Sequence, residues 1–307
     1  MEIHDTAVTD RKRDFDQIWS LLTETHRPIG EDLLPMVNYW SSCRFESWIV
    51  FSAPGDPSAL DRKLHLWRTR DGDLVGLAIV EGLGRDFHVI SHPGFVWMEP
   101  DIVAWVEQHW PADGKNWVTY AEADDRLRQA ALVKLGYRVD ALSETMHAYD
   151  LERLTLIPEL PQGFSFSAAS DDGDLMGRSR LVSMVFHPER DPESTPPPAT
   201  HEKRSYDAAL DLVVRGPDRA PVAFAAGFVN ATSGIAEVEP VGTHPAYRRR
   251  GFALAVVTEV FSRLRDRGVR WVHIASEPEP AVSNRLYHAL GPVGQQHFVR
   301  WRREMHA

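Results

Sequence analysis

The second half of the chain shows the clearest pattern of apolar and polar positions. Three consecutive segments, 207–216, 221–230 and 234–243, have the length and alternation of strands. Apolar residues then recur at steps of three and four, which predicts a helix from about Tyr247 to Arg267. A strand at 270–277, a short helix at 281–290 and a last strand at 295–304 follow. This order predicts an α/β fold with a mixed sheet, in which the long helix crosses over between neighbouring strands.

The first half repeats the same order of elements more faintly. The predicted elements are strands at 63–72, 73–82 and 85–91, a helix at 99–110, a strand at 116–123, a helix at 125–136 and one or two closing strands at 137–151. The repeated order indicates an internal duplication with a period of roughly 150 residues. We therefore expect two tandem domains, each with a mixed central sheet flanked by helices.

The domain boundary is predicted at a break in this pattern. Residues 151–163 contain two prolines and a glycine, and a new alternating segment follows them. Because a chain of 307 residues exceeds the usual size of one core, we predict domains at 1–157 and 158–307. The stretch 187–204 carries five prolines, which deny backbone donors to a helix or central strand, so it is expected to be an exposed or substrate-side loop.

Composition and charge narrow the class of function. With 43% apolar and 25% charged residues, the chain has the composition of a folded globular protein. A net charge of −10 argues against nucleic acid as a partner and favours cationic substrates such as amines. The single cysteine, Cys43, cannot form an internal disulfide, and no segment resembles a secretory signal or a membrane span. We expect a cytoplasmic protein that binds neither nucleic acid nor membrane.

Residues 241–257 carry the most informative motif. A strand ends at Val241-Gly242-Thr243, a proline turn follows, and a helix begins near a glycine flanked by arginines. The first turn of a helix has unpaired N–H groups and partial positive charge, so a diphosphate can bind there. Gly251 allows a phosphate to approach the backbone, and arginine side chains can bind its outer oxygens. The motif predicts an anion site at residues 248–253.

Arg248-x-x-Gly251-x-Ala253 resembles the Q/R-x-x-G-x-G/A signature of the GNAT superfamily of acyl-CoA N-acyltransferases. The resemblance covers about 145 residues, from Gly163 to the C-terminus. It implies acetyl-CoA as co-substrate and no metal. The residues implied in acetyl-CoA binding are Val241, Gly242 and Thr243 beside the pantetheine, and Arg248, Arg249, Arg250, Gly251, Phe252 and Ala253 around the pyrophosphate.

A second feature similar to the family is a short helix with a tyrosine before a Leu-Gly pair. In many relatives this tyrosine protonates the leaving thiolate, which implies Tyr287 as general acid. Many relatives also have an asparagine seven positions earlier, where this chain has Pro280. Ser283 and Asn284 are candidates to replace its contact with pantetheine.

Transfer to an amine also needs a base. An alkylammonium with a pKa near 10.4 costs roughly 4.6 kcal/mol to deprotonate at pH 7. Relatives that use a glutamate base have it six positions before the last pantetheine-pairing residue, which implies Glu237. Glu239 lies on the same face of the predicted strand and is the second candidate.

The first half lacks a counterpart of this motif. Its third strand runs into His92-Pro93-Gly94-Phe95 without an arginine cluster, so we expect a degenerate GNAT-like domain that does not bind CoA. The predicted function is direct acetyl transfer from acetyl-CoA to a small-molecule primary amine. The alternatives are an activity like that of the mycothiol synthases, whose tandem organisation is similar, and a non-catalytic acyl-CoA sensor. A homodimer is possible.

Overall fold

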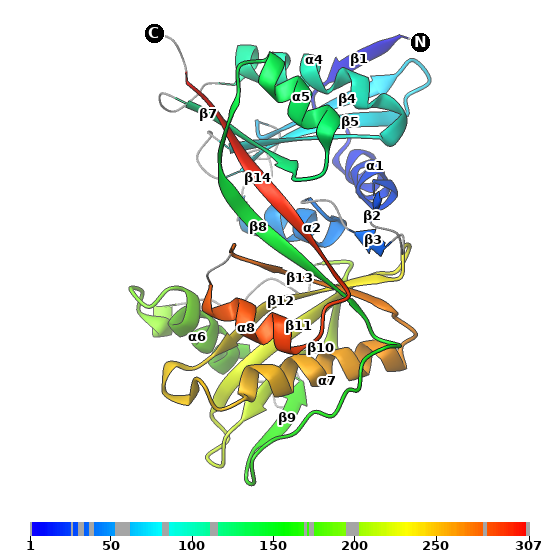
Figure 1. Ribbon diagram of the computed structural model, residues 1–307. Helices are drawn as coiled ribbons and strands as arrows, with labels where there is room; N and C mark the ends of the chain where they lie inside the picture. The colour runs from blue at the N-terminus through cyan, green and yellow to red at the C-terminus, as the bar shows by residue number, and fades with distance from the viewer. Residues whose placement is uncertain are drawn as a thin grey trace. The chain divides into compact units, whose positions relative to one another are not determined.

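The computed structural model describes residues 2–25, 27–29, 34–36, 40–52, 62–81, 86–110, 116–168, 171, 175–194, 203–278 and 281–304 (Figure 1). The chain divides into two compact units. Unit 1 comprises Met1–Thr145 and Gln296–Ala307, and unit 2 comprises Met146–Gln295.

These bounds differ from the predicted boundary between residues 157 and 158. Strand β8, Arg138–Asp150, continues without a break through the division at Thr145, and its last six residues are all buried. Strand β14, Gly294–Glu304, likewise begins in unit 2 and continues in unit 1. Unit 1 thus contains a strand segment from the opposite end of the chain, and unit 2 begins within β8, which the proline-rich stretch after residue 151 does not reveal.

Unit 2 contains every element predicted between residues 206 and 291, whereas the last predicted strand, 295–304, belongs to β14 and lies almost wholly in unit 1. The elements of unit 2 before β14 are β9 (Ser165–Ala168), α6 (Leu175–Phe186), the 3-10 turn η2 (Pro192–Ser194), β10 (Tyr206–Arg215), β11 (Pro221–Asn230), β12 (Ile235–Thr243), the 3-10 turn η4 (Pro245–Tyr247), α7 (Phe252–Asp266), β13 (Trp271–Ser276) and α8 (Val282–Ala289). The strand order is β8-β13-β12-β11-β10-β9. Of these strands, β12 and β13 are parallel, whereas β9 to β12 pair in antiparallel fashion.

The core of unit 2 lies between this sheet and the apolar faces of α7 and α8. Val257, Phe261 and Leu264 of α7 are fully buried there, as the spacing of apolar residues predicted, whereas Leu254, which belongs to the same spacing, is 39% exposed. Helix α6 packs on the opposite face of the sheet through Leu181, which contacts Phe224 of β11. The sheet of unit 2 is therefore covered by helices on both faces.

Unit 1 repeats this architecture. Its elements are β1 (Ile3–Thr6), α1 (Arg11–Glu24), β2 (Arg27–Ile29), β3 (Leu34–Met36), α2 (Ser42–Ser52), β4 (Leu64–Thr69), β5 (Leu74–Glu81), β6 (Asp86–Ser91), the 3-10 turn η1 (Pro93–Met98), α4 (Glu99–His109), β7 (Asn116–Glu122) and α5 (Arg126–Lys134). The strand order is β1-β4-β5-β6-β7-β14, and β2 and β3 form a separate ladder. Across the residues that the structure describes, no helix combines the length and apolar composition needed to span a membrane.

The duplication extends to individual hydrogen bonds of the turn after the third strand of each repeat. The amides of His92 and His244 donate to the carbonyl oxygens of Val75 and Val222, both at 2.9 Å. Each histidine Nδ1 then accepts the amide two residues further on, at 3.1 and 3.2 Å. Each ring also contacts the aromatic ring three residues on, with centroids 5.8 and 5.6 Å apart. The two His-Pro turns therefore have the same local structure.

The division of the chain predicts which fragment folds. Tyr149 of β8 is fully buried, donates its hydroxyl to the carbonyl oxygen of Tyr287 at 2.9 Å and packs against Phe261. A fragment of residues 146–295 keeps these contacts, so it is expected to unfold cooperatively on heating, whereas 158–307 should not. Thermal unfolding by circular dichroism compares the two, and equal cooperativity would contradict the division at Thr145.

Candidate active site

The candidate site is built where the two parallel strands of unit 2 separate. The paired register of β12 and β13 runs from Ile235↔Trp271 to Glu237↔His273. Strand β12 continues for six further residues, to Thr243, and β13 for three, to Ser276. The edge of β12 that faces β13 is therefore unpaired beyond Glu237 among the described residues, and an extended ligand can pair with such an edge.

A β-bulge in β12 lies at the start of this separation. Ala225 and Gly227 of β11, two residues apart, pair with Val241 and Val238, which are three residues apart. One extra residue is thus accommodated around Glu239, and such a bulge bends a strand and increases its twist. The bulge interrupts the alternation of side chains after Val238. The prediction that Glu237 and Glu239 share one face depended on that alternation, so the spacing no longer supports it.

The turn after β12 leads directly into the N-terminus of α7. Arg249 has a φ of 61° and Gly251 a φ of 84°, so the chain reverses over a short distance before α7 begins at Phe252. This is why the helix begins later than the predicted Tyr247. Across the described residues, the backbone N–H groups of Arg249 to Leu254 have no hydrogen-bond partner. A run of unpaired amides at a helix N-terminus is an anion site.

The arginines of this turn have no carboxylate partner among the residues that the structure describes. Arg248 donates through Nε to the carbonyl oxygen of Thr243 at 3.3 Å, and all three side chains from 248 to 250 are exposed. The guanidinium of Arg250 lies 5.2 Å from the ring centroids of both Tyr247 and Phe252. The positive charge of the turn is therefore available to an anionic ligand.

The arginines in the last turns of α7 and at its end make contacts within the protein. Arg263 is paired with Glu259 at 2.8 Å, and Arg267 is paired with Asp207 at 3.1 Å. Arg265 donates to the carbonyl oxygen of Leu154 at 3.3 Å. These contacts stabilise α7 and its surroundings, so only the arginines before α7 belong to the candidate site.

Tyr287 is a residue of α8. It is 7% exposed and belongs to the core cluster of unit 2, and its hydroxyl has no hydrogen-bond partner among the described residues. Burial, with a smaller contribution from the negative charge of Glu239, raises the pKa of Tyr287 to about 12. The structure thus brings Tyr287 and Glu239 within electrostatic range of each other.

Among the described residues, Glu237 is the last one of β12 that is paired with β13. It is 6% exposed, and it lies directly opposite Phe228 on β11 and His273 on β13. Directly opposite residues share a face of the sheet, and their Cβ atoms are about 5 Å apart. The buried carboxylate therefore has an aromatic ring and an imidazole as its lateral neighbours.

The two candidates for the missing asparagine occupy the first turns of α8. Asn284 is 2% exposed, and its Nδ2 donates to the carbonyl oxygen of Glu277 at 3.1 Å, which fixes the start of α8 to the segment after β13. Ser283 is half-buried. Pro280 lies outside the described residues. The contact of Asn284 shows that at least its amide nitrogen has a structural role.

Gly242 has a structural reason to be glycine that the motif did not reveal. A Cβ at this position would lie 2.4 Å from Cζ of Phe224 and 3.0 Å from Cγ1 of Val185. The glycine allows the ring of Phe224 to lie flat against β12 beneath α6. Gly251 differs, because a Cβ there would meet nothing within 4 Å. Of the two glycines, only Gly251 has open space around it for a ligand.

The corresponding cleft of unit 1 is filled by its own side chains. Strands β6 and β7 are paired only at Asp86↔Val118 among the described residues, so they separate as β12 and β13 do. Glu99, the first residue of α4, accepts from the hydroxyl of Ser91 at 2.5 Å and lies 3.8 Å from Nε of Arg128. Arg128 also donates to the carbonyl oxygen of Val89 at 2.6 Å. A cavity of about 10 Å³ remains between these strands.

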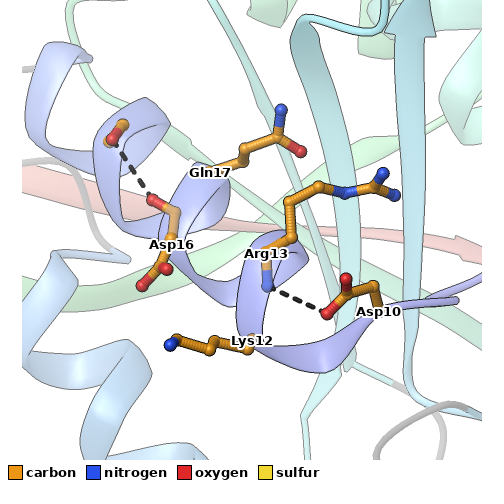
Figure 2. Close-up of a pocket in the computed structure, with 6 residues that line it drawn as sticks. Asp10, Lys12, Arg13, Asp16 and Gln17 are labelled. Carbon is orange, nitrogen blue, oxygen red and sulfur yellow. Dashed lines mark hydrogen bonds between the residues drawn. The ribbon is translucent and has the colours of Figure 1, made fainter.

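A larger pocket of unit 1, of about 360 Å³, lies along α1 (Figure 2). Two of the polar side chains that line this pocket make hydrogen bonds to the backbone of α1. Asp10 caps α1 by accepting the amide of Arg13 at 3.2 Å, and Ser20 donates to the carbonyl oxygen of Asp16 at 3.2 Å. Its lining mixes two acidic and two basic side chains, so it presents no uniform charge to a ligand.

Comparison with known families agrees with the geometry of unit 2. Residues 178–291 match the Acetyltransferase (GNAT) family. Unit 2 contains a GNAT domain. The match covers α6 through α8 and so includes the separated strands, the arginine turn and Tyr287. The GNAT family is one of acyl-CoA-dependent N-acetyltransferases, and no curated protein matches the sequence.

Solved structures extend the similarity of fold to the whole chain. A GCN5-related N-acetyltransferase from Sphaerobacter thermophilus is 21% identical, with a TM-score of 0.63 over 98% of this chain and 95% of that chain. A tandem GNAT protein from the clavulanic acid biosynthesis pathway is 16% identical, with a TM-score of 0.64 over 99% and 98%. A GNAT-family acetyltransferase from Colwellia psychrerythraea is 11% identical, with a TM-score of 0.60 over 100% of both chains. The predicted tandem GNAT fold is confirmed.

The geometry of α7 gives a matched pair of variants for the donor site. Gly251 and Gly268 flank this helix, both have positive φ, and a Cβ at either would meet nothing within 4 Å. Alanine at each should cost a similar amount of stability, about 1–2 kcal/mol. Only Gly251→Ala adds a methyl group at the unpaired amides, so it should weaken acetyl-CoA binding about tenfold or more in calorimetry. Equal weakening by Gly268→Ala would contradict the site.

Proposed function

We propose that the chain transfers an acetyl group from acetyl-CoA directly to a primary amine of a small molecule. The run of amides from Arg249 to Leu254, unpaired among the described residues, carries this proposal, because it lies beside three exposed arginines that have no carboxylate partner in the same part of the chain. A pyrophosphate supplies the negative charge that this turn lacks. The pantetheine would then extend along the open edge of β12 at Val241 to Thr243.

Binding of the thioester at this edge would also activate it. Among the described residues, the backbone N–H groups of β12 that face β13 beyond Glu237 have no strand partner, so one of them can donate to the thioester carbonyl oxygen. Such a donor strengthens as negative charge develops on that oxygen in the transition state. The open edge would therefore orient the donor and polarise its carbonyl.

Glu237 is our candidate for the base. An ammonium acceptor must lose a proton before it attacks, and a carboxylate beside the acceptor can take that proton directly or through water. The aromatic ring of Phe228 on one side suits a cationic acceptor, because a ring face attracts an ammonium group. Glu239 is the second candidate, and its charge acts on Tyr287.

Tyr287 would stabilise the departing sulfur. With a pKa of about 12, this hydroxyl is protonated at every physiological pH. A thiol has a pKa of about 8.5, so complete transfer from Tyr287 to the thiolate would be uphill by roughly 5 kcal/mol. We therefore propose that Tyr287 donates a hydrogen bond to the sulfur, and that the proton lost by the acceptor nitrogen neutralises the thiolate.

Unit 1 is proposed to bind no second acetyl-CoA. Glu99 places a carboxylate at the N-terminus of α4, the position at which unit 2 offers unpaired amides, and Arg128 occupies the space between β6 and β7. One chain would then bind one acetyl-CoA.

Release of the CoA thiol tests the proposed activity. The purified chain is incubated with acetyl-CoA and a panel of amines, and free thiol is measured with a thiol reagent. Amine-dependent release supports transfer. Binding of acetyl-CoA without release with any amine would instead favour a non-catalytic acyl-CoA sensor, which needs neither Glu237 nor Tyr287.

The two glutamates of β12 can be separated by matched variants. Glu237→Gln removes the proposed base and keeps its volume, so kcat should fall about 100- to 10,000-fold. Glu239→Gln makes the same chemical change two residues away and should have a much smaller effect on kcat. Steady-state kinetics with a saturating amine measures both, and a larger loss in Glu239→Gln would move the base to Glu239.

Tyr287→Phe tests the stabilisation of the sulfur. Loss of the hydroxyl should lower kcat about tenfold to 100-fold, with little change in the affinity for acetyl-CoA. In the wild type, Tyr287 stays about 99% protonated at about pH 10, two units below its pKa, so its ionisation should cause no loss of kcat up to that pH. Tyr137→Phe, in a buried tyrosine of unit 1, is the control. Undiminished turnover in Tyr287→Phe would exclude the role.

A further inference from the structure

Unit 2 contains fifteen arginines but a single lysine, Lys203. The difference matters for acyl transfer, because a guanidinium stays protonated whereas an ε-ammonium can lose a proton and act as a nucleophile. Lys203 is therefore the one side chain of unit 2 that has the chemistry of the proposed acceptor.

Lys203 lies beside the candidate base. Its side chain is buried, with 7% of the residue exposed, and its Nζ lies 4.5 Å from the ring centroid of Phe228. Phe228 is directly opposite Glu237, so the ammonium, the aromatic ring and the carboxylate are on the same face of the sheet. An ammonium over this ring is the arrangement that an external cationic acceptor would adopt.

One carboxylate that acts on Lys203 is also paired with another side chain. Asp211 interacts electrostatically with Lys203, but it is paired with Arg178 at 2.6 Å and accepts from the hydroxyl of Tyr206 at 3.1 Å. These contacts hold Asp211 on β10, two strands from Glu237 in the sheet.

We propose that Lys203 is acetylated by its own chain, as an intramolecular acceptor in the site of unit 2. This inference rests on the proposed function. Glu237 takes a proton from the ε-ammonium, and Nζ forms a bond to the thioester carbonyl carbon. The bond between that carbon and sulfur breaks, and the thiolate takes up the second proton of the nitrogen. The products are Nε-acetyl-lysine and the CoA thiol.

Acetylation would change the acceptor side of the site. An amide carries no charge, so the attraction between Nζ and the ring of Phe228 is lost, and the base no longer has a cation beside it. The acetylated side chain would also stay where an external amine must bind. We therefore infer that self-acetylation lowers the rate of transfer to external amines.

The test uses the full-length wild-type chain with acetyl-CoA and no added amine. Acetylation is followed with time by mass spectrometry of the intact chain and of its peptides. Lys12 and Lys134 of unit 1 are exposed and serve as internal controls, since unassisted reaction with acetyl-CoA favours exposed amines. Lys203 should be labelled at least tenfold faster than either, with a rate constant independent of protein concentration. Faster labelling of Lys12 or Lys134 would overturn the proposal.

Two variants test whether the fast acetylation occurs at Lys203 and depends on Glu237. Lys203→Arg keeps the positive charge and should lose the fast label. Glu237→Gln keeps Lys203 and should slow the label about 100-fold or more. Thermal unfolding checks that both variants are folded. If a variant does not fold, the comparison of labelling rates among the lysines of the wild type still tests the proposal. An unchanged rate in folded Glu237→Gln would also overturn the proposal.

The CoA-release assay distinguishes this failure from failure of the proposed function. Thiol release with external amines and no fast label on Lys203 would leave the acetyltransferase activity standing and exclude self-acetylation. Absence of both reactions would exclude the proposed function itself. Fast labelling together with slower transfer to external amines by the labelled chain is the result expected.

Discussion

The candidate site depends on the place at which β12 and β13 stop pairing. If parallel pairing continued past Glu237 and His273, the backbone of Val241 to Thr243 would be used within the sheet. The bulge opposite Ala225 and Gly227 lies where the pairing ends, and it bends β12 away from its parallel neighbour. Packing secures the diverging end, because Gly242 lies against the ring of Phe224 on the α6 side. The contact of Gly242 with Phe224 thus helps to hold the end of β12 where it no longer pairs with β13.

The turn that follows the open end of β12 also carries exposed positive charge in an otherwise acidic chain. Negative charge predominates overall, at −10, yet the turn before α7 exposes three arginines without carboxylate partners among the described residues. Arg270, by contrast, is paired with Asp150 at 2.8 Å. Helix α7 adds the partial positive charge of its N-terminus at the same point. An anion bound there would meet backbone amides, a helix dipole and side chains together, and these contributions act over the same few ångströms.

Much of unit 2 could be predicted from its sequence because its local and tertiary preferences agree. The apolar spacing of α7 matches its buried face, and Gly251, with φ of 84°, falls where a basic turn meets a helix. The boundary between the units could not be predicted in this way. Strand β8 passes through Thr145 without any turn residue, and only pairing partners remote in sequence show that Gln296–Ala307 belong with unit 1.

The missed features of the site share a physical cause. The alternation rule placed Glu237 and Glu239 on one face, and a bulge, which depends on the partner strand, interrupts that alternation. The motif implied a backbone contact of Gly242 with pantetheine, but it did not show that Phe224, eighteen positions earlier in the chain, also requires the absence of a side chain there. Lys203 belongs to the proline-rich stretch that the sequence predicted to be an exposed or substrate-side loop, and the sequence did not show that this residue is buried over Phe228. In each case the deciding contact is non-local, and a single sequence does not show it.

The two units show how a duplicated fold can keep its framework and differ in its site. The two His-Pro turns have the same hydrogen bonds, so each turn is connected to the strand before it in the same way. What differs is the origin of the negative charge at the helix N-terminus. In unit 1 the chain supplies it through Glu99, with Ser91 and Arg128 as partners. In unit 2 the amides and arginines are left for a ligand. A buried carboxylate with fixed partners makes a permanent contact, whereas an exposed set of donors binds only when an anion arrives, and that difference separates a structural repeat from a binding site.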